Sequence, residues 1–157
     1  MRRAILLLAL FSTAASAQLP GLRRRDPAPP VPVLIGIDAL RADFLAKTGS
    51  DIVYFGGDAS VLTPQAQVTL QAQAAWLRQH PEMVVRIEGY ADASDTRDHA
   101  LAVGARRAEE VRSYLVLLGV PAAQLTTLSW GKEKVAVLGS APAALALNRR
   151  TVTVLVR

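Results

Sequence analysis

The chain is organised around residues 88–115, EGYADASDTRDHALAVGARRAEEVRSYL, a stretch typical of a strand end, a polar loop and a long amphipathic helix. A carboxylate, Asp92, follows the strand, and a guanidinium, Arg107, lies on the helix. Small and apolar residues recur three and four positions apart, which predicts one buried helical stripe: Leu101, Gly104, Ala108, Val111 and Leu115. Arg107 is predicted to lie beside this stripe, at its edge. From there its side chain can reach across the loop, so that Arg107 and Asp92 can contact the same group.

These residues resemble the OmpA-like C-terminal domain family, the peptidoglycan-binding domain of outer-membrane proteins, the peptidoglycan-associated lipoprotein and flagellar stator proteins. In that family a G-H-x-D turn precedes the pattern N-x-x-L-[SG]-x-x-R-A-x-x-V-x-x-x-L. The turn here is GYAD at residues 89–92, and the family's Asp and Arg correspond to Asp92 and Arg107. The family's His is replaced by Tyr90, and its Asn by Ala100.

Other parts of the chain agree with this resemblance in order and spacing. Val53-Tyr54-Phe55 matches the family's first strand, and WGKEK at residues 130–134 and NRR at residues 148–150 match the region before its last strand. The resemblance covers about Ile52–Arg157, two-thirds of the chain. It therefore implies an OmpA-like fold for residues 51–157.

Composition excludes several classes of protein. The chain has 157 residues, 51% of them hydrophobic, which is enough for one domain with a core. It has no cysteine, which excludes disulfides, thiol catalysis, cysteine metal sites and a lipid-modified N-terminal cysteine. The net charge is +5, but the Arg23-Arg24-Arg25 run lies outside the predicted domain and aromatic residues make up only 5%. We therefore expect no nucleic-acid partner.

Two N-terminal segments precede the domain. Residues 1–17 are predicted to be a signal peptide, because two arginines, a short apolar run and a small-residue cleavage pattern follow one another. The apolar run is too short to span a bilayer, which takes roughly 20 residues. Residues 18–32 form a linker rich in proline and arginine. The mature protein is expected in the periplasm, without a transmembrane segment and not as a lipoprotein, with an outer-membrane association left open.

The remaining elements follow from periodicity and breakers. Residues 33–50 are predicted to be an extension that packs on the domain, with a helix at about 39–47 closed by Gly49. Within residues 51–157 we expect strands at 52–55, 83–89, 125–130 and 151–156, a helix at 64–79, the helix described above, and a short helix within 132–147. This order, β-α-β-α-β-(α)-β, predicts an α/β two-layer sandwich with helices packed on a mixed sheet.

The resemblance also implies a ligand, the diaminopimelate of the peptide stem in Gram-negative peptidoglycan. Its free end carries an ammonium and a carboxylate. Asp92 would bind the ammonium and Arg107 the carboxylate, helped by the backbone N–H groups at the start of the helix. Four residues are secondary candidates for the same site: Asp58, Ala91, Ala100 and Arg149.

Two other interpretations remain open at this stage. Asp92 and Arg107 can form a simple salt bridge that fixes the loop to the helix. The chain can also be a degenerate family member that docks envelope proteins, an alternative that Tyr90 and Ala100 favour. Catalysis is not expected, since there is no phosphate-binding loop and no serine with a placed histidine and aspartate. His80 and His99 lack metal-ligand spacing, so no metal or cofactor is expected.

Overall fold

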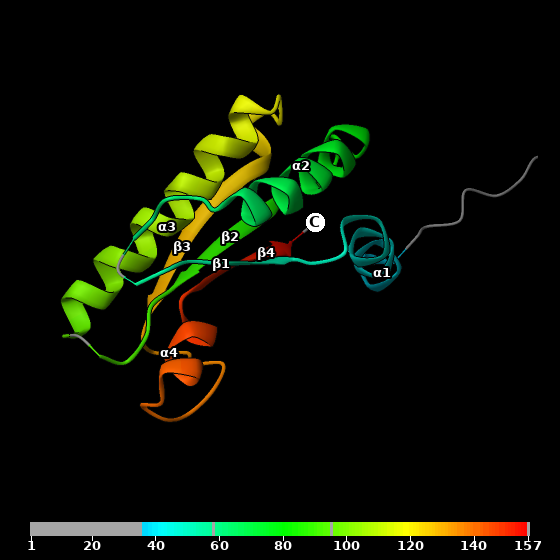
Figure 1. Ribbon diagram of the computed structural model, residues 1–157. Helices are drawn as coiled ribbons and strands as arrows, with labels where there is room; N and C mark the ends of the chain where they lie inside the picture. The colour runs from blue at the N-terminus through cyan, green and yellow to red at the C-terminus, as the bar shows by residue number, and fades with distance from the viewer. Residues whose placement is uncertain (1–35, 58, 95, 157) are drawn as a thin grey trace, which may run out of the picture. The chain divides into compact units, whose positions relative to one another are not determined.

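Four strands form one mixed sheet in the computed structural model, which describes residues 36–57, 59–94 and 96–156 (Figure 1). Their order across the sheet is β1-β4-β2-β3. Strand β2 pairs in parallel with β3 and antiparallel with β4, and β1 pairs antiparallel with β4. Their bounds are β1 Ile52–Tyr54, β2 Val85–Tyr90, β3 Leu125–Gly131 and β4 Arg150–Leu155. The predicted signal peptide and linker lie outside the described residues.

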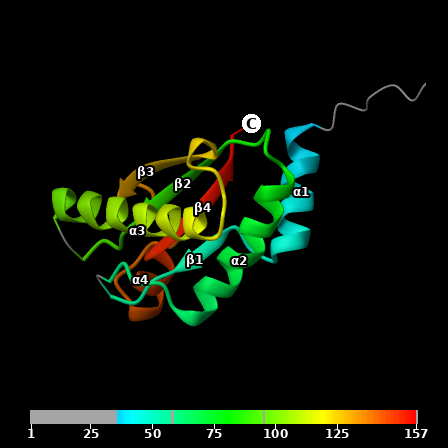
Figure 2. The same cartoon turned by 90° about the horizontal axis from the view of Figure 1, so that it is seen from above.

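Helices cover one face of this sheet, and the predicted α/β class and element order are confirmed. The helices are α1 Ile37–Thr48, α2 Pro64–Gln79, α3 Arg97–Leu117 and α4 Pro142–Asn148, with a 3-10 turn at Ala122–Gln124. Figures 1 and 2 show α2 and α3 side by side over the strands, with α1 on the far side of α2. None of the helices in the described part of the chain is long and apolar enough to cross a membrane.

Helix α2 begins and ends where its sequence predicts. The Thr63 hydroxyl accepts a hydrogen bond from the Ala66 N–H at 3.1 Å, and Pro64 occupies the first helical position, where no N–H is needed. The helix ends before Pro81, which cannot continue it. Its buried residues include Leu70, Ala74 and Leu77, the predicted inner face.

Helix α3 lies unusually close to β2 because two glycines face each other. A Cβ on Gly89 would lie 1.9 Å from the Gly104 carbonyl oxygen, and a Cβ on Gly104 would lie 2.4 Å from the Ser129 hydroxyl. Neither position can therefore hold a side chain without moving the backbone. This contact fixes the first half of α3 over the loop that leaves β2.

The buried face of α3 is wider than the predicted stripe. Gly104, Ala108, Val111 and Leu115 are buried as expected, but Leu101 is only half-buried. Arg107 was predicted beside this stripe rather than in it, and the structure shows that it belongs to the buried face, since the residue is only 1% exposed. The reason is that α3 packs against the loop after β1 as well as against the sheet, so that a second side of the helix is covered.

Helix α1 extends the core beyond the sheet. It is two residues longer at its start than the predicted helix, and Gly49 ends it with φ = 75°. Phe44 packs edge-on against Trp76 of α2, with ring centroids 5.1 Å apart. The Trp76 indole N–H donates to the Asp43 carboxylate at 2.7 Å. Two contacts, one apolar and one polar, therefore hold α1 on α2.

We expect Asp43→Ala to loosen this attachment measurably. The substitution removes the acceptor of the Trp76 N–H, which should lower the free energy of unfolding by about 1 kcal/mol and the melting temperature by a few degrees. Asp38→Ala is the control, because Asp38 lies on the same helix and its side chain is 93% exposed. Equal melting of both variants, measured by circular dichroism, would contradict a stabilising role for the Asp43–Trp76 bond.

Candidate functional site

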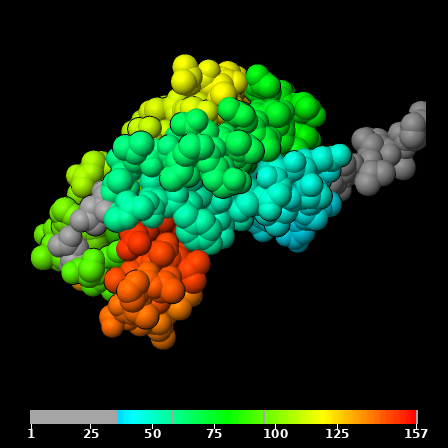
Figure 3. Space-filling view, in the orientation of Figure 1, coloured from blue at the N-terminus to red at the C-terminus, as the bar shows by residue number. Residues whose placement is uncertain are grey.

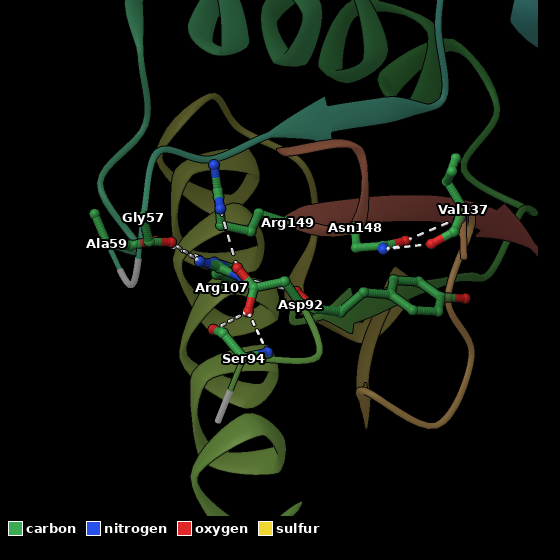
Figure 4. A network of polar contacts seen from close by, with 9 residues as sticks. Gly57, Ala59, Asp92, Ser94, Arg107, Val137, Asn148 and Arg149 are labelled. Atoms are coloured by element: carbon green, nitrogen blue, oxygen red, sulfur yellow. Dashed lines mark hydrogen bonds and ion pairs between the residues drawn. The ribbon is translucent and has the colours of Figure 1, made fainter. Parts of the chain in front are cut away.

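Asp92 lies just beyond the end of β2, in a loop that contacts Arg149, the residue that follows α4. One of its carboxylate oxygens accepts hydrogen bonds from the Ser94 N–H, at 3.0 Å, and from the Ser94 hydroxyl. The other accepts from the Arg149 guanidinium, also at 3.0 Å. Figure 4 shows the carboxylate enclosed between these two residues. Asp92 is only 6% exposed, so its negative charge has a fixed position.

Arg149 belongs to the turn that joins α4 to β4. The Arg149 side chain remains 20% exposed, whereas the Asp92 side chain is 8% exposed, so the pair is accessible from the arginine side. Burial alone would raise the pKa of the Asp92 carboxyl, but hydrogen bonds from Ser94 and the charge of Arg149 outweigh it and hold that pKa below its ordinary value. The carboxylate is therefore ionised at neutral pH.

This lowered pKa predicts a stability effect at acid pH. A carboxyl whose pKa is lower in the folded than in the unfolded chain stabilises the fold above about pH 4, and this contribution is lost as the pH falls through the folded-state pKa. We therefore expect the wild-type protein to be more stable than Asp92→Asn at pH 7, with the difference shrinking below pH 4. Urea unfolding of both proteins across this range measures it. A difference that grew on acidification would contradict the assignment.

The Arg107 side chain extends from α3 to the same end of the sheet, where β2 ends. Its guanidinium donates to the carbonyl oxygens of Ala59 at 3.1 Å, of Tyr90 at 2.9 Å, and of Gly57. It also lies 5.4 Å from the centre of the Phe55 ring. Arg107, on α3, therefore binds the loop after β1 and the end of β2. Its partner at the end of β2, Tyr90, lies two residues before Asp92. From the sequence, Arg107 was the primary candidate for the cation of the site and Arg149 a secondary one. In the structure, the guanidinium that binds the Asp92 carboxylate at 3.0 Å is that of Arg149.

The other secondary candidates differ in position. Ala91 and Ala100 are 6% and 1% exposed and pack with Val103 in a small apolar cluster beneath the loop. Neither side chain offers a polar atom that could bind a charged ligand. Asp58 lies outside the described residues. Thr96 caps the start of α3, four residues after Asp92, by accepting from the His99 N–H at 3.3 Å.

Tyr90 stands where the family pattern has histidine. Its side chain lies on the same face of β2 as Glu88, opposite the face that α3 covers. Its hydroxyl donates to Glu88 at 2.5 Å, and the Arg150 guanidinium lies 4.0 Å over its ring. Burial and the negative charge of Glu88 raise the pKa of the Tyr90 hydroxyl well above its ordinary range. The Glu88 side chain is only 9% exposed, and Arg86, Tyr90 and Trp130 all hydrogen-bond to it. The Tyr90 side chain is therefore held by Glu88 and Arg150.

Two residues of the site were missed in the sequence. Ser94 follows Asp92 by two positions, the spacing at which an aspartate accepts from a backbone N–H in a turn, so this signal was present. Asn148, only 1% exposed, positions Arg149 by binding the backbone of Ala136 and Val137. Asn148 was noted only as part of the NRR pattern, and its partners could not be predicted because they lie 11 and 12 residues away.

The arrangement offers a buried anion, Asp92, next to a partly exposed cation, Arg149, which suits a ligand that carries both charges close together. In residues 36–57, 59–94 and 96–156, no three histidine, aspartate or glutamate side chains are placed to hold a metal ion.

Comparison with known proteins agrees with the pattern of these residues. The model of the OmpA family matches residues 54–149 of the chain. The peptidoglycan-associated lipoprotein of Agrobacterium fabrum is 42% identical over 113 residues, which cover 72% of this chain and 63% of that protein. The chain belongs to the OmpA family. As a member of this noncatalytic family it is not an enzyme, as the sequence predicted.

Two solved structures share the fold of this chain. The crystal structure of the peptidoglycan-associated lipoprotein from Burkholderia pseudomallei is 41% identical, with a TM-score of 0.67, and the match covers 68% of this chain and 91% of that one. The C-terminal domain of Helicobacter pylori MotB is only 17% identical but has a TM-score of 0.64 over 68% of this chain and 84% of that one. The same α/β fold therefore occurs in a protein of low sequence identity.

Proposed function

We propose that this domain binds peptidoglycan noncovalently, through the free end of diaminopimelate in the peptide stem, and so attaches an envelope component to the cell wall. The observation that carries the proposal is the Asp92–Arg149 ion pair at 3.0 Å, beside the ends of the two central strands, β2 and β4, of an OmpA-family domain. The names of its relatives support it, since proteins such as that of Agrobacterium fabrum are called peptidoglycan-associated lipoproteins.

The ligand would insert its two charges into the existing pair. The diaminopimelate ammonium would replace Arg149 as the partner of one Asp92 oxygen, and Arg149 would turn to the ligand carboxylate, where two parallel hydrogen bonds are available. The positive end of α3 lies next in the chain and favours the same carboxylate. Opposite charges thus exchange partners, and no charge is left buried alone.

Arg107 would act mainly by supporting the loop next to the site, not by binding the ligand. Its hydrogen bonds to Gly57 and Ala59 hold the loop after β1 and so shape the site. A ligand carboxylate can reach its guanidinium directly only if one of these loop carbonyls gives up its bond. We therefore assign Arg107 to positioning first and to ligand contact second.

Weak individual binding suits this target. Each charged hydrogen bond contributes about 1.5–3 kcal/mol, which allows micromolar to millimolar affinity for one stem. A wall polymer presents many stems, so rebinding raises the effective affinity. The proposed location is the periplasm, after export directed by residues 1–17.

A competition experiment tests the choice of ligand. Binding of the protein to purified sacculi is measured by sedimentation in the presence of a stem peptide containing diaminopimelate or the same peptide containing lysine. Lysine keeps the ammonium but lacks the second carboxylate, so it should compete at least about tenfold less well. Equal competition would indicate nonspecific charge binding. Sedimentation absent even without competitor would favour the alternative, a module that docks envelope proteins.

A further inference from the structure

A second surface, distinct from the charged site, lies on the segment between β3 and β4. Residues 135–147 contain no charged side chain, although 20% of the chain is charged. Yet much of the segment faces solvent: Leu138 is 87% exposed, Leu147 44% and Val137 38%. Figure 3 shows the segment, in orange, at the lower edge of the face in view. We name residues 135–147 the apolar loop surface.

The apolar loop surface is held in one conformation by a buried side chain. The Asn148 amide donates to the Val137 carbonyl at 2.8 Å and accepts from the N–H groups of Ala136 at 2.7 Å and Val137 at 3.1 Å. Figure 4 shows Asn148 facing Val137. Leu138, next in the chain, therefore lies on the outside of a segment whose conformation is fixed by these hydrogen bonds.

The neighbourhood of this surface is cationic and aromatic. The Lys134 ammonium lies 3.4 Å over the centre of the Trp130 ring, directly before the apolar segment. Glu133, the acid between two lysines, is bound to Arg97 at 2.7 Å, which neutralises it. Trp130 itself is partly buried, because its indole N–H donates to Glu88 at 3.0 Å, and Lys134 is exposed. A lysine at the border of an apolar surface can lay its stem against lipid while its ammonium stays in water among anionic headgroups.

The size of the surface argues against a stable dimer. Such an interface needs about 800 Å² from each partner, with aromatic anchors at its centre. One fully exposed leucine, two half-exposed aliphatic residues and several alanines offer far less. Shallow insertion into lipid requires no such area, because each apolar side chain that enters contributes separately.

We propose that the apolar loop surface docks on an anionic lipid membrane. Leu138 and Leu147 enter the boundary between headgroups and acyl chains, and Lys134 pairs with anionic headgroups around them. This binding is separate from the proposed binding of the wall, since it uses neither Asp92 nor Arg149.

Flotation with vesicles tests this assignment. The purified full-length protein is mixed with phosphatidylcholine vesicles with or without phosphatidylglycerol, and the bound fraction gives a partition coefficient. Leu138→Asp should lower binding to anionic vesicles about tenfold or more. Lys134→Gln should lower it about fivefold, with little effect on uncharged vesicles.

Leu117→Asp is the matched control. Leu117 is 79% exposed, close to the 87% of Leu138, and the substitution changes the charge equally, but it lies at the end of α3 far from α4 in Figure 1. It should leave binding within about twofold of wild type. The Arg23–Arg25 run is present in all variants, so it does not affect the comparison.

Four results would overturn the proposal. They are absence of wild-type binding to anionic vesicles, equal losses in Leu138→Asp and Leu117→Asp, equal binding to vesicles with and without phosphatidylglycerol, and a dimer in sedimentation that Leu138→Asp dissociates. The last result would assign the surface to a second copy of the chain. Circular dichroism melting of each variant shows whether a loss reflects unfolding.

Discussion

Asp92→Ala is expected to lower binding to sacculi by a factor of about thirty or more. Removing one partner of a desolvated, ligand-bound charge pair costs roughly 2–5 kcal/mol, which corresponds to this factor or a larger one. The substitution also leaves Arg149 without its carboxylate partner, so the cation is no longer held toward the site. Pull-down with purified sacculi over a range of protein concentrations gives the change in affinity directly.

The control for Asp92→Ala is Asp98→Ala. Asp98 lies in the first turn of α3, a few residues further along, and is exposed. Its removal changes the net charge equally, so binding that depended only on charge would fall equally in both variants. Sacculus binding unchanged by Asp92→Ala would reduce the Asp92–Arg149 pair to a salt bridge between two loops, and the effect would then appear only in thermal melting.

Most helices and strands were predictable because their signals are local. Thr63-Pro64 predicts the start of α2 and Pro81 predicts its end, and these residues lie at or next to the ends of the helix. The alternation of Val85 and Ile87 likewise identified β2, although the strand extends to Tyr90. Such signals depend on backbone geometry within a few residues, so one sequence is enough to detect them.

The partners in the charged site were not predictable in this way. Arg149 and Asp92 are 57 residues apart, and Arg107 and Gly57 are 50 apart, so their contacts depend on the order of strands in the sheet. Periodicity alone places an arginine in the middle of a helix at the edge of a buried stripe, with its head in water. It became buried because backbone carbonyls of a distant loop were placed to accept from it, and no pattern around residue 107 reports this.

Arg107 therefore gives the second large prediction, and it concerns stability as well as binding. Arg107→Leu should lower the free energy of unfolding by about 2–4 kcal/mol, because three carbonyl oxygens lose a charged donor and only those in the loop can turn to water. The melting temperature should fall by roughly 10 °C. A simple ligand-contacting arginine at the surface would change melting by less than about 0.5 kcal/mol, so calorimetry separates the two roles.

Two further variants complete the test of Arg107. Arg106→Leu, at the exposed neighbouring position of the same helix, should melt within a degree or two of the wild type. Arg107→Lys keeps the charge but cannot serve three acceptors in fixed directions, so it should restore only part of the stability. If Arg107 acts by positioning, sacculus binding should fall in proportion to the disorder of the loop at Gly57 and Ala59, and Arg107→Lys should bind better than Arg107→Leu. Full stability of Arg107→Leu with lost binding would instead make this guanidinium a direct ligand of the stem carboxylate, because a side chain that supports the loop cannot be removed without effect on unfolding.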